Sequence, residues 1–248
     1  LGPNQFTVLG GTTTGPGYTL TNAEAGRIRA GTLRILVPAL GNAANRAPDL
    51  IVRDLTVSGG GATAGLGTLE IISPGIGRVE GNVLMTGARA QDGLLINARD
   101  RLEVVTPTAS VRVRGAAGAP GGTLTLVSNN LWVASSAIID LLRANPDYAG
   151  RDDDLIDDDG VNAPRGYIEG NAVQLTTRGS LFVQNTTSAR GTFASGRDFG
   201  GVTTGAGGLT ISSLGGTPAL VYAFGRRLNP DGTFTTGDTF FFASNYDD

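Results

Sequence analysis

The chain is 248 residues long and contains 39 glycines, while charged residues make up only 17%, a share too small for a disordered protein. Glycine is roughly twice as frequent as in average proteins, and the lack of a Gly-X-Y period excludes collagen. A net charge of −3 at pH 7 excludes the strongly basic surface of proteins that bind nucleic acid or anionic membranes.

The first segment, residues 1–26, mixes Gly, Pro and Thr around short apolar runs and predicts an irregular start. Strand-like runs then follow one another through residues 27–142 and again through 167–225. In most of them two apolar residues flank one polar or charged residue, so the apolar pair lies on one face of a strand. The clearest frames are Leu50-Ile51-Val52, Leu55-Thr56-Val57, Leu69-Glu70-Ile71, Leu102-Glu103-Val104, Val111-Arg112-Val113, Leu124-Thr125-Leu126, Val173-Gln174-Leu175, Leu181-Phe182-Val183 and Leu209-Thr210-Ile211.

The stretch 122–134 shows this pattern most completely. It begins at a glycine, alternates apolar and polar residues, and then breaks at the polar residues 128–130, which predict a corner because short amide side chains favour turns. A second short strand follows the corner. The residues expected in the core are Leu124, Leu126, Leu131 and Val133, and Trp132 is expected to face the other way.

Short strands at a fixed period, with Gly and Asn corners between them, are typical of a β-solenoid. Successive frames begin 17–22 residues apart where a full coil is expected, as from Leu33 to Leu50 and from Leu50 to Leu69. The alternative all-β fold is an antiparallel β-sandwich, whose hairpins would need more turn pairs such as Asp92-Gly93. We therefore expect an all-β chain folded as a parallel β-solenoid.

Residues 135–166 interrupt the strand pattern. A serine cap and apolar residues three and four apart predict a short helix over 135–144, which Asn145-Pro146 ends. We expect residues 143–166 to form an acidic loop extruded from the solenoid wall.

Six aspartates lie within eight residues of this loop. Carboxylate oxygens are the ligands that Ca²⁺ prefers, which makes the loop a candidate Ca²⁺ site, although the ligand spacing does not fit an EF-hand. The other interpretation is a solvated acidic loop that keeps the protein soluble. The candidate ligands are Asp152, Asp153, Asp154, Asp157, Asp158 and Asp159.

The last segment, residues 226–248, predicts a terminal hairpin or the start of another segment. The chain does not begin with a basic stretch followed by an apolar one, and no apolar run approaches the roughly 18 residues of a membrane span. Residue Leu1 is not an initiator methionine. We interpret the chain as an internal or processed piece of a larger protein.

The chain contains no Cys and no His, and its 19 basic residues are all arginine. This excludes thiol nucleophiles, imidazole bases, Ser-His-Asp triads and the usual zinc sites. A polysaccharide lyase or hydrolase remains as the enzymatic alternative, because β-helices also carry such enzymes. Its candidate residues would be the outward frame residues Glu70, Glu103 and Arg112, although charged residues in that position are usually solvated surface.

Two further features have an ordinary interpretation beside a functional one. Asn185-Thr186-Thr187 fits an N-glycosylation acceptor and equally a turn. Several aromatic residues are able to stack on sugars, but their place inside strand runs favours the core or the ends of the solenoid. These aromatics are Trp132, Tyr167, Phe182, Tyr222, Phe224, Phe240, Phe241 and Phe242.

The phrases DLIVRDLTVSGGG, GTLTLVSNNLWV and AVQLTTRGSLFVQN resemble those of the filamentous-haemagglutinin-like exoproteins of Gram-negative bacteria. The resemblance spans residues 30–225, lies in composition and period, and carries no catalytic motif. It implies a right-handed parallel β-helix, here with one extruded acidic loop. It further implies secretion through an outer-membrane partner, a place on the cell surface or outside the cell, and a role in adhesion or contact-dependent competition.

We therefore expect a non-catalytic structural or adhesive segment of a large secreted bacterial surface protein. The expected partners are neighbouring solenoid segments or identical chains end to end, surface glycans, and receptors on host or neighbouring cells. The alternatives are a self-assembling subunit of an extracellular filament or sheath, and the polysaccharide-active enzyme. Ca²⁺ at the acidic loop is the one cofactor considered, and any recognition surface is expected where that loop leaves the wall.

Overall fold

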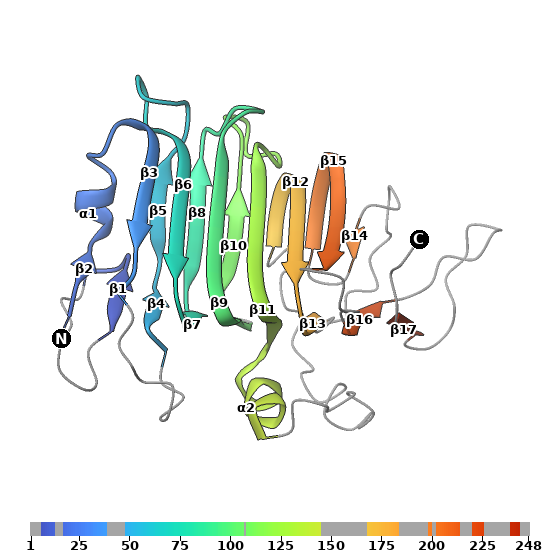
Figure 1. Cartoon of the computed structure of the whole chain (residues 1–248). Helices are drawn as coiled ribbons and strands as arrows, with labels where there is room; N and C mark the ends of the chain where they lie inside the picture. Colours follow the sequence, from blue (N-terminus) through green and yellow to red (C-terminus); the bar gives the residue numbers. More distant parts are fainter. Residues whose placement is uncertain are drawn as a thin grey trace.

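The computed structural model is mostly β, with a large sheet of parallel strands and few helices (Figure 1). It describes residues 6–12, 17–38, 48–106, 108–144, 168–183, 198–199, 202–213, 220–225 and 239–243. The main strands pair in parallel from coil to coil, an arrangement consistent with a β-solenoid. The antiparallel sandwich is therefore wrong, since among the residues of these ranges antiparallel pairing is confined to β14 with β15, β16 with β17 and one isolated bridge.

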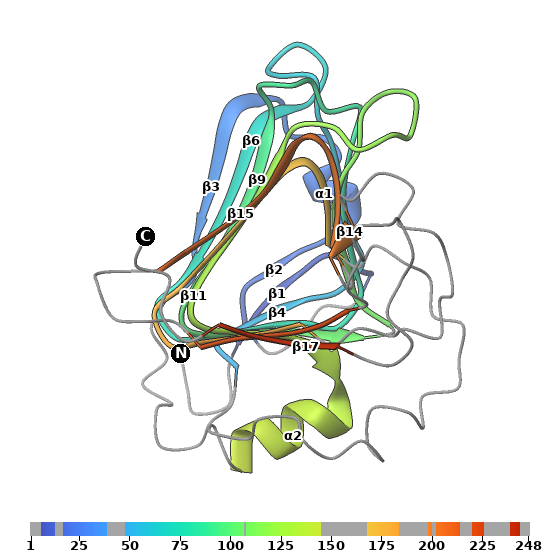
Figure 2. The same ribbon diagram turned by 90° about the vertical axis from the view of Figure 1, so that its right-hand side faces the viewer.

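Viewed down the axis along which the coils stack, three walls enclose the core (Figure 2). Wall A consists of β3 (Ala30–Leu36), β6 (Leu66–Ser73), the first halves of β9 (Gly93–Thr106) and β11 (Thr123–Ser135), and the second halves of β12 (Ile168–Thr177) and β15 (Val202–Ser213). Wall B consists of β1 (Thr7–Leu9), β4 (Leu50–Val52), β7 (Ile76–Val79), the second halves of β9 and β11, β13 (Ser180–Val183) and β16 (Leu220–Gly225). Wall C consists of β5 (Leu55–Ser58), β8 (Asn82–Thr86), β10 (Ser110–Val113) and the first residues of β12 and β15.

The remaining elements lie at the ends of these walls or outside them. Three short strands and two helices belong to this group: β2 (Thr19–Leu20), β14 (Asp198–Phe199), β17 (Thr239–Ala243), α1 (Asn22–Ala25) and α2 (Ser136–Ala144). No helix in the described ranges is long and apolar enough to cross a membrane.

The parallel register stacks apolar side chains into columns inside the walls. The column inside wall A consists of Leu33, Leu69, Leu94, Leu124, Val173 and Leu209. Its four middle members are buried and belong to one continuous core cluster, whereas its two end members are only partly buried. The prediction for 122–134 is confirmed, because Leu124, Leu126, Leu131 and Val133 lie in this cluster and Trp132 does not.

The expected spacing of 17–22 residues per coil is wrong. The register pairs Leu55 with Val83 and Val83 with Val111, so one coil of wall C advances by 28 residues. The reason is that each coil contains three walls, and each wall can carry its own apolar–polar–apolar frame. Neighbouring frames in the sequence, such as those at Leu50 and Leu55, therefore lie on different walls rather than on top of one another.

The predicted corner at 128–130 is a bulge within β11, which carries the strand from wall A to wall B. The buried Ser128 hydroxyl donates to the carbonyl oxygen of Ala98 in the preceding coil at 2.6 Å. At the start of the same strand Gly122 has a φ of +62°, and a Cβ there would lie 2.5 Å from the carbonyl oxygen of Asp92. Glycine is thus required where this strand begins.

The helix predicted over 135–144 is confirmed as α2. The extruded acidic loop lies outside the described residues from 145 onward. The first segment, expected to be irregular, holds α1 and β1, and β1 pairs in parallel with β4 as a strand of wall B. In the last segment, β17 pairs with β16 in antiparallel orientation.

Stacking of the inner columns predicts that Leu124→Ala will lower the free energy of unfolding by about 2–5 kcal/mol, because it leaves a cavity between two packed coils. Thr125→Ala, one residue away but on the outer face, should cost less than about 1 kcal/mol. Urea unfolding followed by circular dichroism measures both values. Equal losses for the two variants would contradict the assignment of the inner column.

Candidate functional site

The outer face of wall B carries a column of side chains unlike the aliphatic column inside it. The register places Ile51, Arg78, Glu103 and Trp132 on successive coils at one position. Each lies between two inward residues of its own strand, as Glu103 lies between Leu102 and Val104. Charged and aromatic side chains therefore meet on the outside of the wall.

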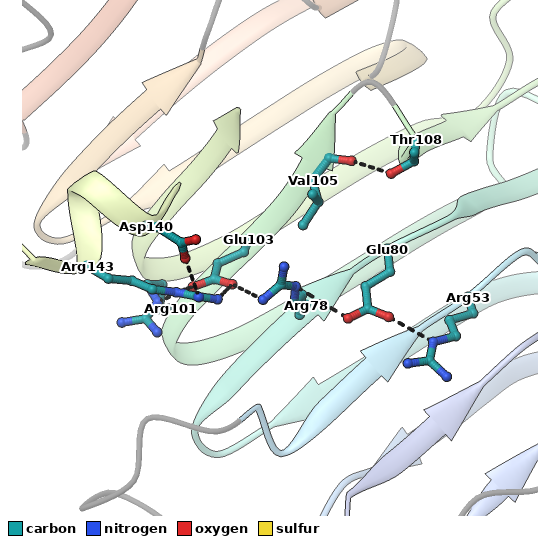
Figure 3. A network of polar contacts seen from close by, with 9 residues as sticks. All are labelled: Arg53, Arg78, Glu80, Arg101, Glu103, Val105, Thr108, Asp140 and Arg143. Carbon is teal, nitrogen blue, oxygen red and sulfur yellow. Dashed lines mark hydrogen bonds and ion pairs between the residues drawn. The ribbon is translucent and has the colours of Figure 1, made fainter. Parts of the chain in front are cut away.

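Glu103 is the centre of this group and has no exposed surface. Its carboxylate accepts from Arg101 Nε at 2.7 Å, and from Arg143 through Nη2 at 2.5 Å and Nε at 2.9 Å. Arg78 Nη1 lies 3.8 Å from Oε2 of the same carboxylate. Figure 3 shows the three guanidinium groups converging on Glu103 from β7, β9 and α2.

The ion pairs continue on both sides of Glu103 (Figure 3). On one side Arg78 Nε lies 3.4 Å from Glu80, which also accepts from Arg53 Nε at 2.8 Å. On the other side Arg143 donates to Asp140 within α2 at 2.8 Å. We call these residues, Arg53, Arg78, Glu80, Arg101, Glu103, Asp140 and Arg143, the wall B charge network.

The hydrogen bond to Glu103 raises the pKa of the Arg143 guanidinium above its ordinary value, and its attraction to Glu103 and Asp140 acts in the same direction against the effect of burial. Arg143 is therefore held as a cation at the end of α2, where positive charge is also favoured by the helix dipole.

Helix α2 covers part of the outer face of wall B (Figure 2). Its Ile139 and Leu142, three residues apart, are buried although neither belongs to the core cluster. Trp132 is likewise only 2% exposed on the outer side, with the Arg101 guanidinium 5.0 Å from its ring centre. The helix contacts both β9 and β11, the strand that carries Trp132.

A comparable ion cluster lies on wall C. Glu169 is 5% exposed and accepts from Arg114, whose Nη2 lies 2.7 Å from Oε2 and whose Nε lies 3.1 Å from both oxygens. Arg112 Nε lies 3.9 Å from the same carboxylate. The guanidinium groups of Arg112, in β10, and of Arg114, which follows that strand, thus neutralise a carboxylate of β12 in the next coil.

Asp92 connects the turn at Gly60 with the turn at Arg89, which lie in neighbouring coils. Its buried carboxylate accepts from the backbone N–H groups of Gly60 and Arg89, each at 2.8 Å, and from Arg89 Nη2 at 2.8 Å. Burial opposes the charge, but the hydrogen bonds from Arg89 and Gly60 outweigh it and lower the pKa of Asp92 below its ordinary value. The ionised form is therefore the one that fits the folded corner.

The three candidate residues for an enzyme, Glu70, Glu103 and Arg112, all lie in ion pairs. Glu70 is partly exposed and accepts from Arg34 Nε at 2.5 Å, while Arg112 is paired with Glu169. The expectation that Glu103 is solvated surface is wrong, because arginines and α2 enclose it. Of these carboxylates, Glu103 has no surface from which it can touch a substrate.

The candidate Ca²⁺ ligands Asp152, Asp153, Asp154, Asp157, Asp158 and Asp159 lie outside the described residues, as do Asn185-Thr186-Thr187 and Tyr167. Within the described ranges no group of three or more acidic side chains is arranged to hold a metal ion. Among the candidate aromatics of the described ranges, Trp132 is buried. The remaining ones lie in strands β13, β16 and β17: Phe182, Tyr222, Phe224, Phe240, Phe241 and Phe242.

The sequence did not reveal the role of Arg143, Asp140 or Glu169. Arg143 stands at the end of a predicted helix, which is a common place for a cation. Only the position of α2 shows that Arg143 meets Glu103, and only the register of β10 and β12 places Glu169 beside Arg112.

A scan against protein-family models and searches of curated proteins and of solved structures found no match to this chain.

The wall B charge network predicts that Glu103→Gln will lower the free energy of unfolding by about 3–5 kcal/mol, because it removes a buried carboxylate and leaves the partly buried arginines around it without their counter-charge. Glu70→Gln, which removes one exposed ion pair, should cost at most about 1 kcal/mol. Urea unfolding gives both values. Trp132 is the one tryptophan of the chain, so acrylamide quenching of its fluorescence should also increase in Glu103→Gln if α2 loosens. Similar costs for the two variants would contradict the burial of Glu103.

The lowered pKa of Asp92 predicts a pH-dependent contribution to stability. The stabilisation is complete above the unfolded-state pKa of about 3.9 and is lost as the pH falls through the lower folded-state value. Asp92→Asn should therefore be less stable than the natural chain at pH 7, and the difference should shrink below about pH 4. Thermal unfolding across this range checks it, with the exposed Asp100→Asn as a control. A difference that stays constant with pH would contradict the role of the charge.

Proposed function

We propose that the chain is a non-catalytic structural and adhesive segment of a large secreted bacterial surface protein. In this proposal it forms coils of a right-handed parallel β-helix of the filamentous-haemagglutinin-like kind. Its task is to extend a stiff rod from the cell and to present surface along it.

One observation supports this proposal above the others: the charged side chains of the outer walls bind one another from coil to coil. Arg34 binds Glu70, Arg53 binds Glu80, and Arg114 binds Glu169, each from a different coil. Opposite charges arranged in this way fasten the coils together. A polysaccharide-active site would instead need carboxylates directed at a bound sugar.

The stacked columns supply the second support. Each coil buries its apolar side chains only by contact with the coils on either side, so the rod lengthens by repetition without a larger core. Because neighbouring parallel strands lie about 4.8 Å apart, each added coil lengthens the rod by only that distance, and the closely spaced ladders keep the rod stiff. These are properties that a surface stalk needs.

Location is tested on cells of the source strain. Antibodies raised against the purified chain should label intact, non-permeabilised cells or the culture medium, and protease added outside the cells should abolish the labelling. Labelling that requires permeabilised cells would overturn the proposal.

The non-catalytic part is tested with acidic and neutral polysaccharides. Incubation with the purified chain, with and without Ca²⁺, should release no oligosaccharides, whereas retention on a glycan or cell-surface array would identify the adhesive partner. Release of defined oligosaccharides that Glu70→Gln abolishes would establish the enzyme instead.

A further inference from the structure

β5 is the first strand of wall C, and it pairs in parallel with β8 of the next coil. A strand at the edge of a sheet exposes N–H and C=O groups that pair readily with another chain. The N–H of Gly59 donates to the carbonyl oxygen of Thr86 in β8, so by alternation the backbone groups of Thr56 point to the opposite side of β5. On that side lies the short helix α1, at the first-coil end of the molecule (Figure 1).

The side chain of Asn22, the first residue of α1, bonds to the backbone of this edge at two points. Its Oδ1 accepts from the N–H of Thr56 at 2.7 Å, and its Nδ2 donates to the carbonyl oxygen of Asp54. The two backbone groups flank Leu55 in the sequence. One carboxamide therefore supplies both a donor and an acceptor to the outer edge of wall C.

These two hydrogen bonds have the pattern of a parallel ladder. In such a ladder a residue donates its N–H to the carbonyl of the residue before its partner and accepts from the N–H of the residue after it. Thr123, the partner of Gly93, donates to Asp92 in this way. The carboxamide of Asn22 makes the same two bonds around Leu55, so it takes the place that a residue of a preceding parallel strand would occupy.

Further contacts hold α1 in this position. Thr21 and Glu24 form a capping box, in which the N–H of Thr21 donates to the Glu24 carboxylate at 2.8 Å. The N–H of Asn22 donates to the carbonyl oxygen of Gly11, which follows β1. Ala25 is 2% exposed and belongs to the continuous core cluster. The helix is therefore anchored in the core of the first coil as well as on the strand edge.

We propose that α1 caps the solenoid at the first coil of wall C, and that Asn22 prevents β5 from pairing with a strand of another chain. A second copy of this chain, or a coil of another solenoid segment, can bond to Thr56 and Asp54 only after α1 has been displaced. The end-to-end contacts expected from the sequence are thus blocked at this edge. The inference goes beyond the proposed function and does not depend on it.

Hydrogen exchange tests the strand-like bonds directly. The Thr56 amide should be protected in the natural chain, and Asn22→Ala should speed its exchange roughly tenfold, as expected for the loss of one hydrogen bond. Asn97→Ala is the matched control, because it removes a carboxamide from the outer face of the central strand β9 and should leave Thr56 unchanged. A Thr56 amide that exchanges in the natural chain as fast as in an unfolded peptide would overturn the proposal.

The capping role is tested by association. In a linker variant, residues 21–26 are replaced by glycine and serine, so that the chain keeps its length but α1 does not form. Its weight-average sedimentation coefficient should rise with concentration more steeply than that of the natural chain. Asn22→Ala, which keeps the helix, should show a smaller rise and decides the matter if circular dichroism finds the linker variant unfolded. Folded variants that sediment like the natural chain at every concentration would show that the capping role is wrong.

Two substitutions added to the linker variant show whether the association uses the edge of β5. Thr56→Pro removes the N–H directed away from β8 and should abolish the association. Thr56→Ala keeps that N–H and should leave the association in place. Thr56 is exposed, so neither change removes a core side chain. Association that persists with Thr56→Pro would assign it to another surface and overturn the role of this edge.

Discussion

The structure depends on the in-register stacking of parallel coils. At a strand spacing of about 4.8 Å each side chain lies directly beside its counterpart in the next coil, so its neighbour is fixed by the register. Inside the walls this places leucine, isoleucine and valine on one another. Outside the walls the same rule places charges side by side, and the chain satisfies it by pairing opposite signs, as Arg78 with Glu103 and Arg34 with Glu70.

The geometry of these ion pairs favours arginine over lysine. A guanidinium group has a planar fork of donors that matches a carboxylate with two hydrogen bonds, while an ammonium group is a single strongly hydrated charge. Arg114 on Glu169 and Arg143 on Glu103 both make such two-point contacts, and both carboxylates are buried. Lysine would leave part of each carboxylate without a donor.

The sequence predicted the parts of the fold that depend on local pattern. Alternation identified Leu124 and Leu126 as core and Trp132 as outward, and apolar spacing identified α2. It failed where the answer depends on which segments become neighbours. The predicted coil length is wrong because each coil carries several frames. The prediction of Glu103 as solvated surface is wrong because no residue near it in the sequence shows that Arg143 covers it.

The direction of the bonds between coils has a mechanical consequence. Ladder hydrogen bonds, and ion pairs such as Arg53 with Glu80 and Arg114 with Glu169, run from one coil to the next, along the length of the rod. Tension applied at the two ends loads these interfaces in series, and because each coil contacts only its neighbours the weakest interface yields first. The rod would then lengthen one coil at a time under load, dissipating work gradually where a globular tether would give way in a single step.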